Sequence, residues 1–77
     1  MSAELFDVPG LVRRVRRADD LSQRDLADEL GVAQATVARW EMGESEPTLS
    51  MFQRLLALAD WGLAVVDEAG DAVLPME

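Results

Sequence analysis

Residues 22–58 constrain the fold of this 77-residue chain more than any other part, because they contain two short helical segments separated by a tight turn. The first helix is predicted over Gln23–Leu30, and Ser22 stands before it at the N-cap position of a capping box. Gly31 follows the helix as the residue that most readily adopts positive φ. The second helix is predicted over Gln34–Met42. These residues therefore predict a sharp bend between two short helices.

A further helix is expected on each side of this pair. Asp7 can cap a helix that begins near Val8, where apolar residues recur at helical spacing. Thr48 can cap another helix over residues 49–60. The apolar stripes of the helices predict one shared core, formed by Val15, Leu26, Leu30, Val32, Val37, Trp40, Leu49, Phe52, Leu55, Leu56 and Ala59.

Two short helices joined by a glycine-containing turn form a helix-turn-helix. Within and around this motif the chain has Leu21, Ser22, Gln23, Leu26, Ala27, Leu30, Gly31, Val32, Gln34, Thr36, Val37, Arg39, Trp40, Glu41, Gly43, Pro47 and Leu49. With these residues at this spacing, the stretch resembles the Cro and phage-repressor class of helix-turn-helix domains, also called the xenobiotic-response-element class. The resemblance implies a mainly α, lambda-repressor-like bundle of four helices that binds DNA as a bacterial-type transcriptional regulator, expected to be a repressor.

The C-terminal segment departs from the all-helical plan of that class. Residues 63–66 and 72–74 favour strands, and the acidic and glycine residues between them favour a turn. We expect a β-hairpin over residues 61–77 in place of a fifth helix, a helix-turn-helix domain over residues 8–60, and a flexible N-terminus over residues 1–7. A hairpin of two strands needs a packing partner. That partner is either the chain's own helices or a second subunit, and in the second case we expect a homodimer through Val65, Val66, Val73 and Leu74.

The residue types present exclude most catalytic chemistry. The chain has no cysteine, histidine, lysine or tyrosine. It therefore lacks the usual general base, thiol nucleophile and metal ligands, and we expect no enzyme, no cofactor and no metal site. No apolar run is long enough to span a bilayer, and the first residues do not form a signal peptide. These observations favour a cytoplasmic protein without membrane contact.

The net charge of −8 opposes non-specific attraction to DNA. All seven arginines and eight of the acidic residues lie within residues 8–58, so that segment has a net charge of −1. The remaining acidic residues lie in the flanks. A nearly neutral body can still present a locally basic surface to double-stranded DNA.

The resemblance assigns base contacts to the second helix of the pair, and the residue types fit them. Gln34 can bond the N6 and N7 atoms of adenine. Ala35 and the methyl group of Thr36 can contact a thymine methyl group. Arg39 can bind guanine O6 and N7 with two hydrogen bonds, or else a phosphate. We expect these side chains to share the DNA-facing surface.

The resemblance also supplies phosphate contacts and one structural ion pair. Gln23 begins a helix whose N-terminus can bind a phosphate, and it often braces the residue corresponding to Gln34. Arg16 and Ser45 are further expected phosphate contacts. In this class an arginine at the position of Arg16 pairs with the residue corresponding to Glu41, so we interpret that pair as structural first.

Three departures from the family pattern leave alternative functions open. Ala33 replaces the usual Ser or Thr N-cap, Met42 replaces a polar or basic residue, and Glu44 and Glu46 stand where Lys or Arg is usual. One alternative is an antitoxin that holds a basic toxin with an acidic flank. The other is an adaptor that binds protein through the acidic loop rather than DNA.

Overall fold

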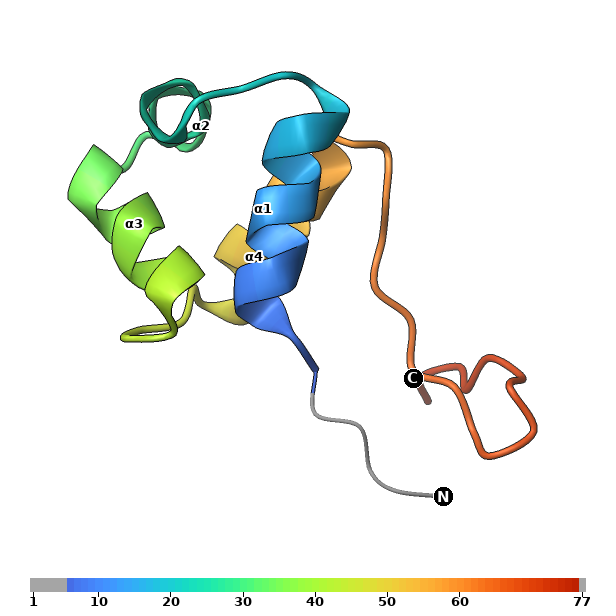
Figure 1. Cartoon of the computed structure of the whole chain (residues 1–77). Helices are drawn as coiled ribbons and strands as arrows, with labels where there is room; N and C mark the ends of the chain where they lie inside the picture. The colour runs from blue at the N-terminus through green and yellow to red at the C-terminus, as the bar shows by residue number, and fades with distance from the viewer. Residues whose placement is uncertain (1–5, 77) are drawn as a thin grey trace.

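The computed structural model describes residues 6–76, and within them the chain forms four helices. They are α1 (Val8–Ala18), α2 (Gln23–Leu30), α3 (Gln34–Met42) and α4 (Leu49–Ala57). Helices α2 and α3 pack on each other, and both pack on the pair formed by α1 and α4 (Figure 1). None of the helices among residues 6–76 has the length and apolar character needed to cross a membrane.

Local capping explains where the helices begin. Asp7 accepts a hydrogen bond from the Gly10 N–H and caps α1, as predicted. Thr48 likewise caps α4 by accepting from the Met51 N–H. Helix α4 ends at Ala57, because residues 58–60 continue as turns and the chain leaves the helix with positive φ at Asp60. The predicted end at residue 60 was therefore too late.

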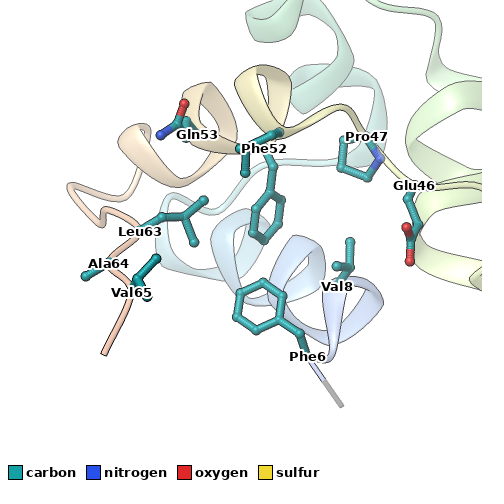
Figure 2. A pocket seen from close by; sticks show the side chains of 10 residues that line it. Phe6, Val8, Glu46, Pro47, Phe52, Gln53, Leu63, Ala64 and Val65 are labelled. Atoms are coloured by element: carbon teal, nitrogen blue, oxygen red, sulfur yellow. The ribbon is translucent and has the colours of Figure 1, made fainter. Parts of the chain in front are cut away.

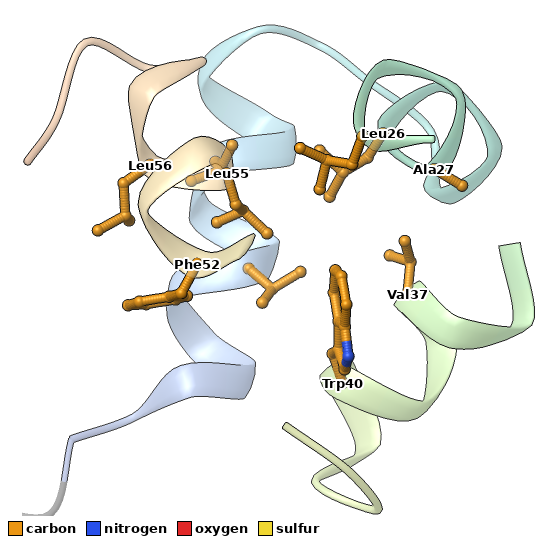
Figure 3. Packing of buried hydrophobic residues seen from close by; sticks show 10 residues of the cluster. Leu26, Ala27, Val37, Trp40, Phe52, Leu55 and Leu56 are labelled. Atoms are coloured by element: carbon orange, nitrogen blue, oxygen red, sulfur yellow. The ribbon is translucent and has the colours of Figure 1, made fainter. Parts of the chain in front are cut away.

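The core lies between the four helices and contains most of the residues predicted for it. Figure 3 shows the Trp40 indole pointing from α3 into the apolar cluster, where 4% of its surface stays exposed. The cluster consists of Val12, Val15, Leu26, Ala27, Leu30, Val37, Trp40, Phe52, Leu55 and Leu56. Leu49 was expected in this core, and that prediction is wrong, because its side chain is 69% exposed at the first position of α4.

The predicted C-terminal β-hairpin is also wrong. Within residues 6–76 the chain has no strand, and the segment after α4 makes one isolated antiparallel bridge between Val66 and Ala72. The Val73 N–H donates to the Val65 carbonyl, and the Asp67 side chain accepts from two backbone N–H groups of the turn. The valines flanking the turn remain exposed, so no burial extends the bridge into a ladder. We call residues 61–76 the arm.

The arm leaves the end of α4 and runs away from the helical bundle (Figure 1). Leu63 packs against the core at its base, while most of the residues that follow are exposed. The expected flexible N-terminus lies largely outside the described residues. Of its described part, Phe6 packs edge-on against Phe52, with ring centroids 5.6 Å apart.

Candidate nucleic-acid interface

The turn between α2 and α3 forms as the sequence predicts. Ser22 caps α2 in a reciprocal capping box with Asp25, and both hydrogen bonds are present. Gly31 ends α2 at φ 72°, a left-handed conformation that favours glycine. Ala33 then precedes α3 with extended backbone, and its methyl side chain offers no acceptor to the first N–H groups of the helix. The Thr36 N–H donates to the Ala33 carbonyl at 3.0 Å, and the two N–H groups before it in α3 receive no side-chain cap.

Helix α3 divides into a buried side and an exposed side. Val37 and Trp40 face the core, whereas Gln34, Ala35 and Arg39 are exposed and Thr36 is half-buried. Ala35 and Arg39 are four residues apart, so they occupy the same face of the helix. The structure thus places the four predicted base-contacting residues on one short helix, with its long polar side chains toward solvent.

One carboxylate joins α1, α2 and α3. The Glu41 side chain is 6% exposed and pairs with Arg16, whose Nε and Nη2 atoms donate to the two carboxylate oxygens at 2.5 and 3.0 Å. Gln23 donates its amide to the same carboxylate at 3.1 Å. Arg13 donates to the backbone carbonyl of Glu41 at 2.8 Å. We call Arg13, Arg16, Gln23 and Glu41 the Glu41 cluster; it fixes the C-terminal end of α3 relative to α1 and α2.

The pKa values follow from these contacts. Burial of Glu41 opposes its ionisation, but hydrogen bonds from Arg16 and Gln23, with the attraction of Arg16 and Arg13, hold its pKa below the ordinary value. The hydrogen bond to Glu41 raises the pKa of Arg16. Asp25 also has a lowered pKa, because it accepts a hydrogen bond from the Ser22 N–H. Glu41 is therefore an ionised acceptor at neutral pH, and its charge is compensated within the cluster.

The side chains predicted to contact phosphate differ in whether they already make hydrogen bonds within the protein. Arg16 uses its third nitrogen, Nη1, to donate to the Leu21 carbonyl at 3.1 Å, so each nitrogen of its guanidinium group donates a hydrogen bond within the protein. The Gln23 amide is bound to Glu41, and this contact was not predicted from the sequence. Ser45 is exposed in the loop after α3, beside the exposed carboxylates of Glu44 and Glu46.

The four residues expected to form a dimer contact all lie on the arm. Val65, Val66, Val73 and Leu74 are exposed by 50–79% in the single chain. They lie on a segment separate from α3, so they occupy a different part of the molecule from the predicted base contacts (Figure 1).

Comparison with known protein families matches the helical part of this arrangement. A family model described as "Helix-turn-helix" matches residues 12–60, more than half of the chain. The match covers α2, α3, α4 and most of α1. No curated protein matched the chain, and no solved structure did.

Proposed function

The chain belongs to the Cro and phage-repressor class of helix-turn-helix DNA-binding transcriptional regulators, and on that premise we propose that it is a repressor that reads an inverted repeat in the cytoplasm. The observation that carries the proposal is the exposed face of α3, which contains Gln34, Ala35 and Arg39. The Glu41 cluster holds this helix against α1 and α2. A helix in this motif presents its N-terminal residues to base edges in the major groove.

The side chains of α3 have separate tasks in this proposal. Gln34 reads adenine, Ala35 and Thr36 contact thymine methyl groups, and Arg39 reads guanine. Arg39 differs from Arg16 in that it is exposed and available for a base. The protein acts by binding, with no cofactor and no metal.

Phosphate contacts hold the helix in register. Ser45 and the N-terminus of α2 at Gln23 contribute to them, and Arg16 offers its two remaining N–H groups. Because Glu44 and Glu46 lie in the loop that follows α3, the phosphate contribution is small and the affinity depends on base contacts. We therefore expect a shallow dependence of affinity on salt.

The experiment is a selection of binding sites from random duplex DNA at low salt, followed by titration of the enriched site. Arg39→Ala removes the guanine contact and should weaken binding about 5- to 150-fold, the range for one lost bidentate pair. Arg54→Ala is the matched control, since Arg54 is an exposed arginine on α4. No enriched sequence, or equal binding by the two variants, contradicts DNA reading by α3 and favours the adaptor.

A two-fold dimer supplies the second half-site, with recognition helices about 34 Å apart along one face of the duplex. The dimer contact consists of the arm residues Val65, Val66, Val73 and Leu74. Antiparallel pairing of two arms covers these side chains and places the acidic turns at opposite ends. Exposure of so many large apolar side chains on one short segment supports this contact.

Sedimentation tests the dimer. Val66→Glu should give monomers and weaken operator binding, because a carboxylate would be buried in the contact. Ala69→Glu, in the exposed turn of the arm, is the control and should leave the dimer intact. A monomeric wild-type protein at the concentrations that saturate the operator would refute the dimer.

A further inference from the structure

We propose that the groove between the arm and the helical bundle binds an apolar segment of another protein that also carries Arg or Lys side chains. The groove has a volume of about 510 Å³. Figure 2 shows the Phe6 and Phe52 rings at its centre, Val8, Pro47 and Glu46 on one side, and residues 63–65 of the arm on the other. Leu49 and Gln53 complete its lining.

The walls of the groove are apolar and solvent-accessible. Phe6 is 61% exposed, although its ring rests edge-on against Phe52. Leu49 and Val65, which also line the groove, are each 69% exposed. Leu49 is the first residue of α4, and its exposed side chain is not part of the apolar cluster of the core. An apolar side chain of a partner would bury these three surfaces together.

Eight of the ten lining residues come from residues 44–76, and the charge of that segment indicates the chemistry of the occupant. Of its described lining residues, Glu46 alone is charged. Residues 44–76 contain six acidic residues, which are Glu44, Glu46, Asp60, Asp67, Glu68 and Asp71, and one arginine, Arg54. A partner segment that has cationic side chains on both sides of an apolar strip would be attracted electrostatically to the acidic residues of this segment.

A second copy of the chain fits the groove less well. Its exposed apolar segment is the arm, which brings three more carboxylates and no cationic side chain. Of the four residues in the proposed dimer contact, only Val65 also lines the groove. The proposed dimer contact and the groove therefore share Val65, and the other nine lining residues lie outside that contact. None of these lining residues lies on α3, so DNA binding by α3 does not depend on the groove.

Three synthetic peptides test the proposal. They share the same pattern of leucines, and their remaining positions are all Arg in the first peptide, all Gln in the second and all Glu in the third. We expect calorimetry to show the arginine peptide binding at least about tenfold more tightly than the other two, and less tightly at higher salt. Leu49→Gln should weaken its binding about tenfold. Met42→Gln is the matched control, because Met42 is 66% exposed on α3, and it should bind like the wild type. Both substitutions replace exposed side chains, so circular dichroism should show an unchanged fold.

Each other outcome overturns the proposal. Equal binding of the arginine peptide by the Leu49 and Met42 variants would mean diffuse attraction to an acidic protein. Equal binding of the arginine and glutamine peptides would mean that charge does not select the occupant. A Leu49→Gln protein that sediments as a smaller species than the wild type would assign the groove to a second copy. Operator binding by Leu49→Gln, measured in parallel, separates these results from a failure of the DNA-binding proposal.

Discussion

Replacing Arg16 with methionine would leave the Glu41 carboxylate buried with a single side-chain partner. In the wild type the carboxylate accepts from Arg16 twice and from Gln23 once. Methionine is also a long, unbranched side chain, but it donates no hydrogen bond. The Gln23 amide and the nearby Arg13 charge remain. The variant therefore isolates how much the ion pair between α1 and α3 contributes to the free energy of unfolding.

The exposure of the two side chains sets the magnitude. A solvent-exposed ion pair contributes about 0–1 kcal/mol, whereas removing one partner of a buried pair costs about 3–5 kcal/mol. Here Arg16 is 24% exposed and Glu41 is 6% exposed, so the pair is closer to the buried case. We expect Arg16→Met to lower the free energy of unfolding by about 2–3 kcal/mol. For a domain of this size that corresponds to a fall in Tm of about 10–20 °C.

Replacing Glu41 should lower the free energy of unfolding less than replacing Arg16 does. Replacing both residues should lower it about as much as replacing Glu41 alone. Glu41→Met leaves the more exposed Arg16 able to turn toward water, so we expect a loss of about 1–2 kcal/mol. The double variant buries no unpaired charge, and we expect it to lose about 1–2 kcal/mol as well. The double-mutant cycle then gives a coupling energy of about 2 kcal/mol. Urea unfolding followed by far-UV circular dichroism measures all four proteins.

The pH dependence provides the second test of the same reasoning. In the wild type the pKa of Glu41 is lowered, so its stabilising contribution is present above the unfolded pKa and is lost as the pH falls. In Arg16→Met the burial of Glu41 dominates, so its pKa rises above the unfolded value. Acid then protonates the carboxylate and removes the cost of burying its charge. The stability difference between the two proteins should therefore shrink below about pH 5. A difference that stays constant with pH, or a coupling energy near zero, would refute the reasoning.

Three further predictions concern the fold. Ala33→Ser should raise the unfolding free energy by about 1 kcal/mol by capping α3, seen as a higher Tm, and an unchanged Tm would show that solvent already satisfies those N–H groups. Leu26→Ala should lower it by about 2–5 kcal/mol, because Leu26 is fully buried, and a urea midpoint close to the wild type would contradict that packing. The pKa values of Glu41 and Asp25 are lowered from 4.5 and 3.8, so wild-type stability should hold above these values and fall as the pH drops below them toward the lowered pKa values of the folded protein; a flat profile in acid urea titrations would argue against both contacts.

The parts of the fold that depend on neighbouring residues could be predicted from the sequence. The bounds of α2 and α3 were predicted correctly, because caps and glycines within a few residues determine where a short helix begins and ends. The exposure of Leu49 could not be predicted in this way. Its helical spacing matched the apolar stripe of α4, but the first residue of that helix extends past the edge of the core.

The Glu41 cluster was predicted only in part from the sequence. The Arg16–Glu41 pair was expected because the chain resembles its family, not because of any local pattern. Gln23 and Arg13 reach Glu41 across 18 and 28 residues of sequence, and their partners follow from how α1 and α2 pack around α3. Neither residue lies in a pattern that would have assigned it to this carboxylate.

By itself, the sequence determined the order of the helices, their caps, the turn between α2 and α3, and the residues that α3 can offer to DNA. These features depend on backbone preferences and on periodicity within one helix. The tertiary structure decided which donors meet on Glu41, that the arm makes a single bridge instead of two strands, and that Phe6, Leu49 and Val65 line one groove. The physical reason is that such contacts depend on the distances between elements, and those distances are set by packing of the whole core.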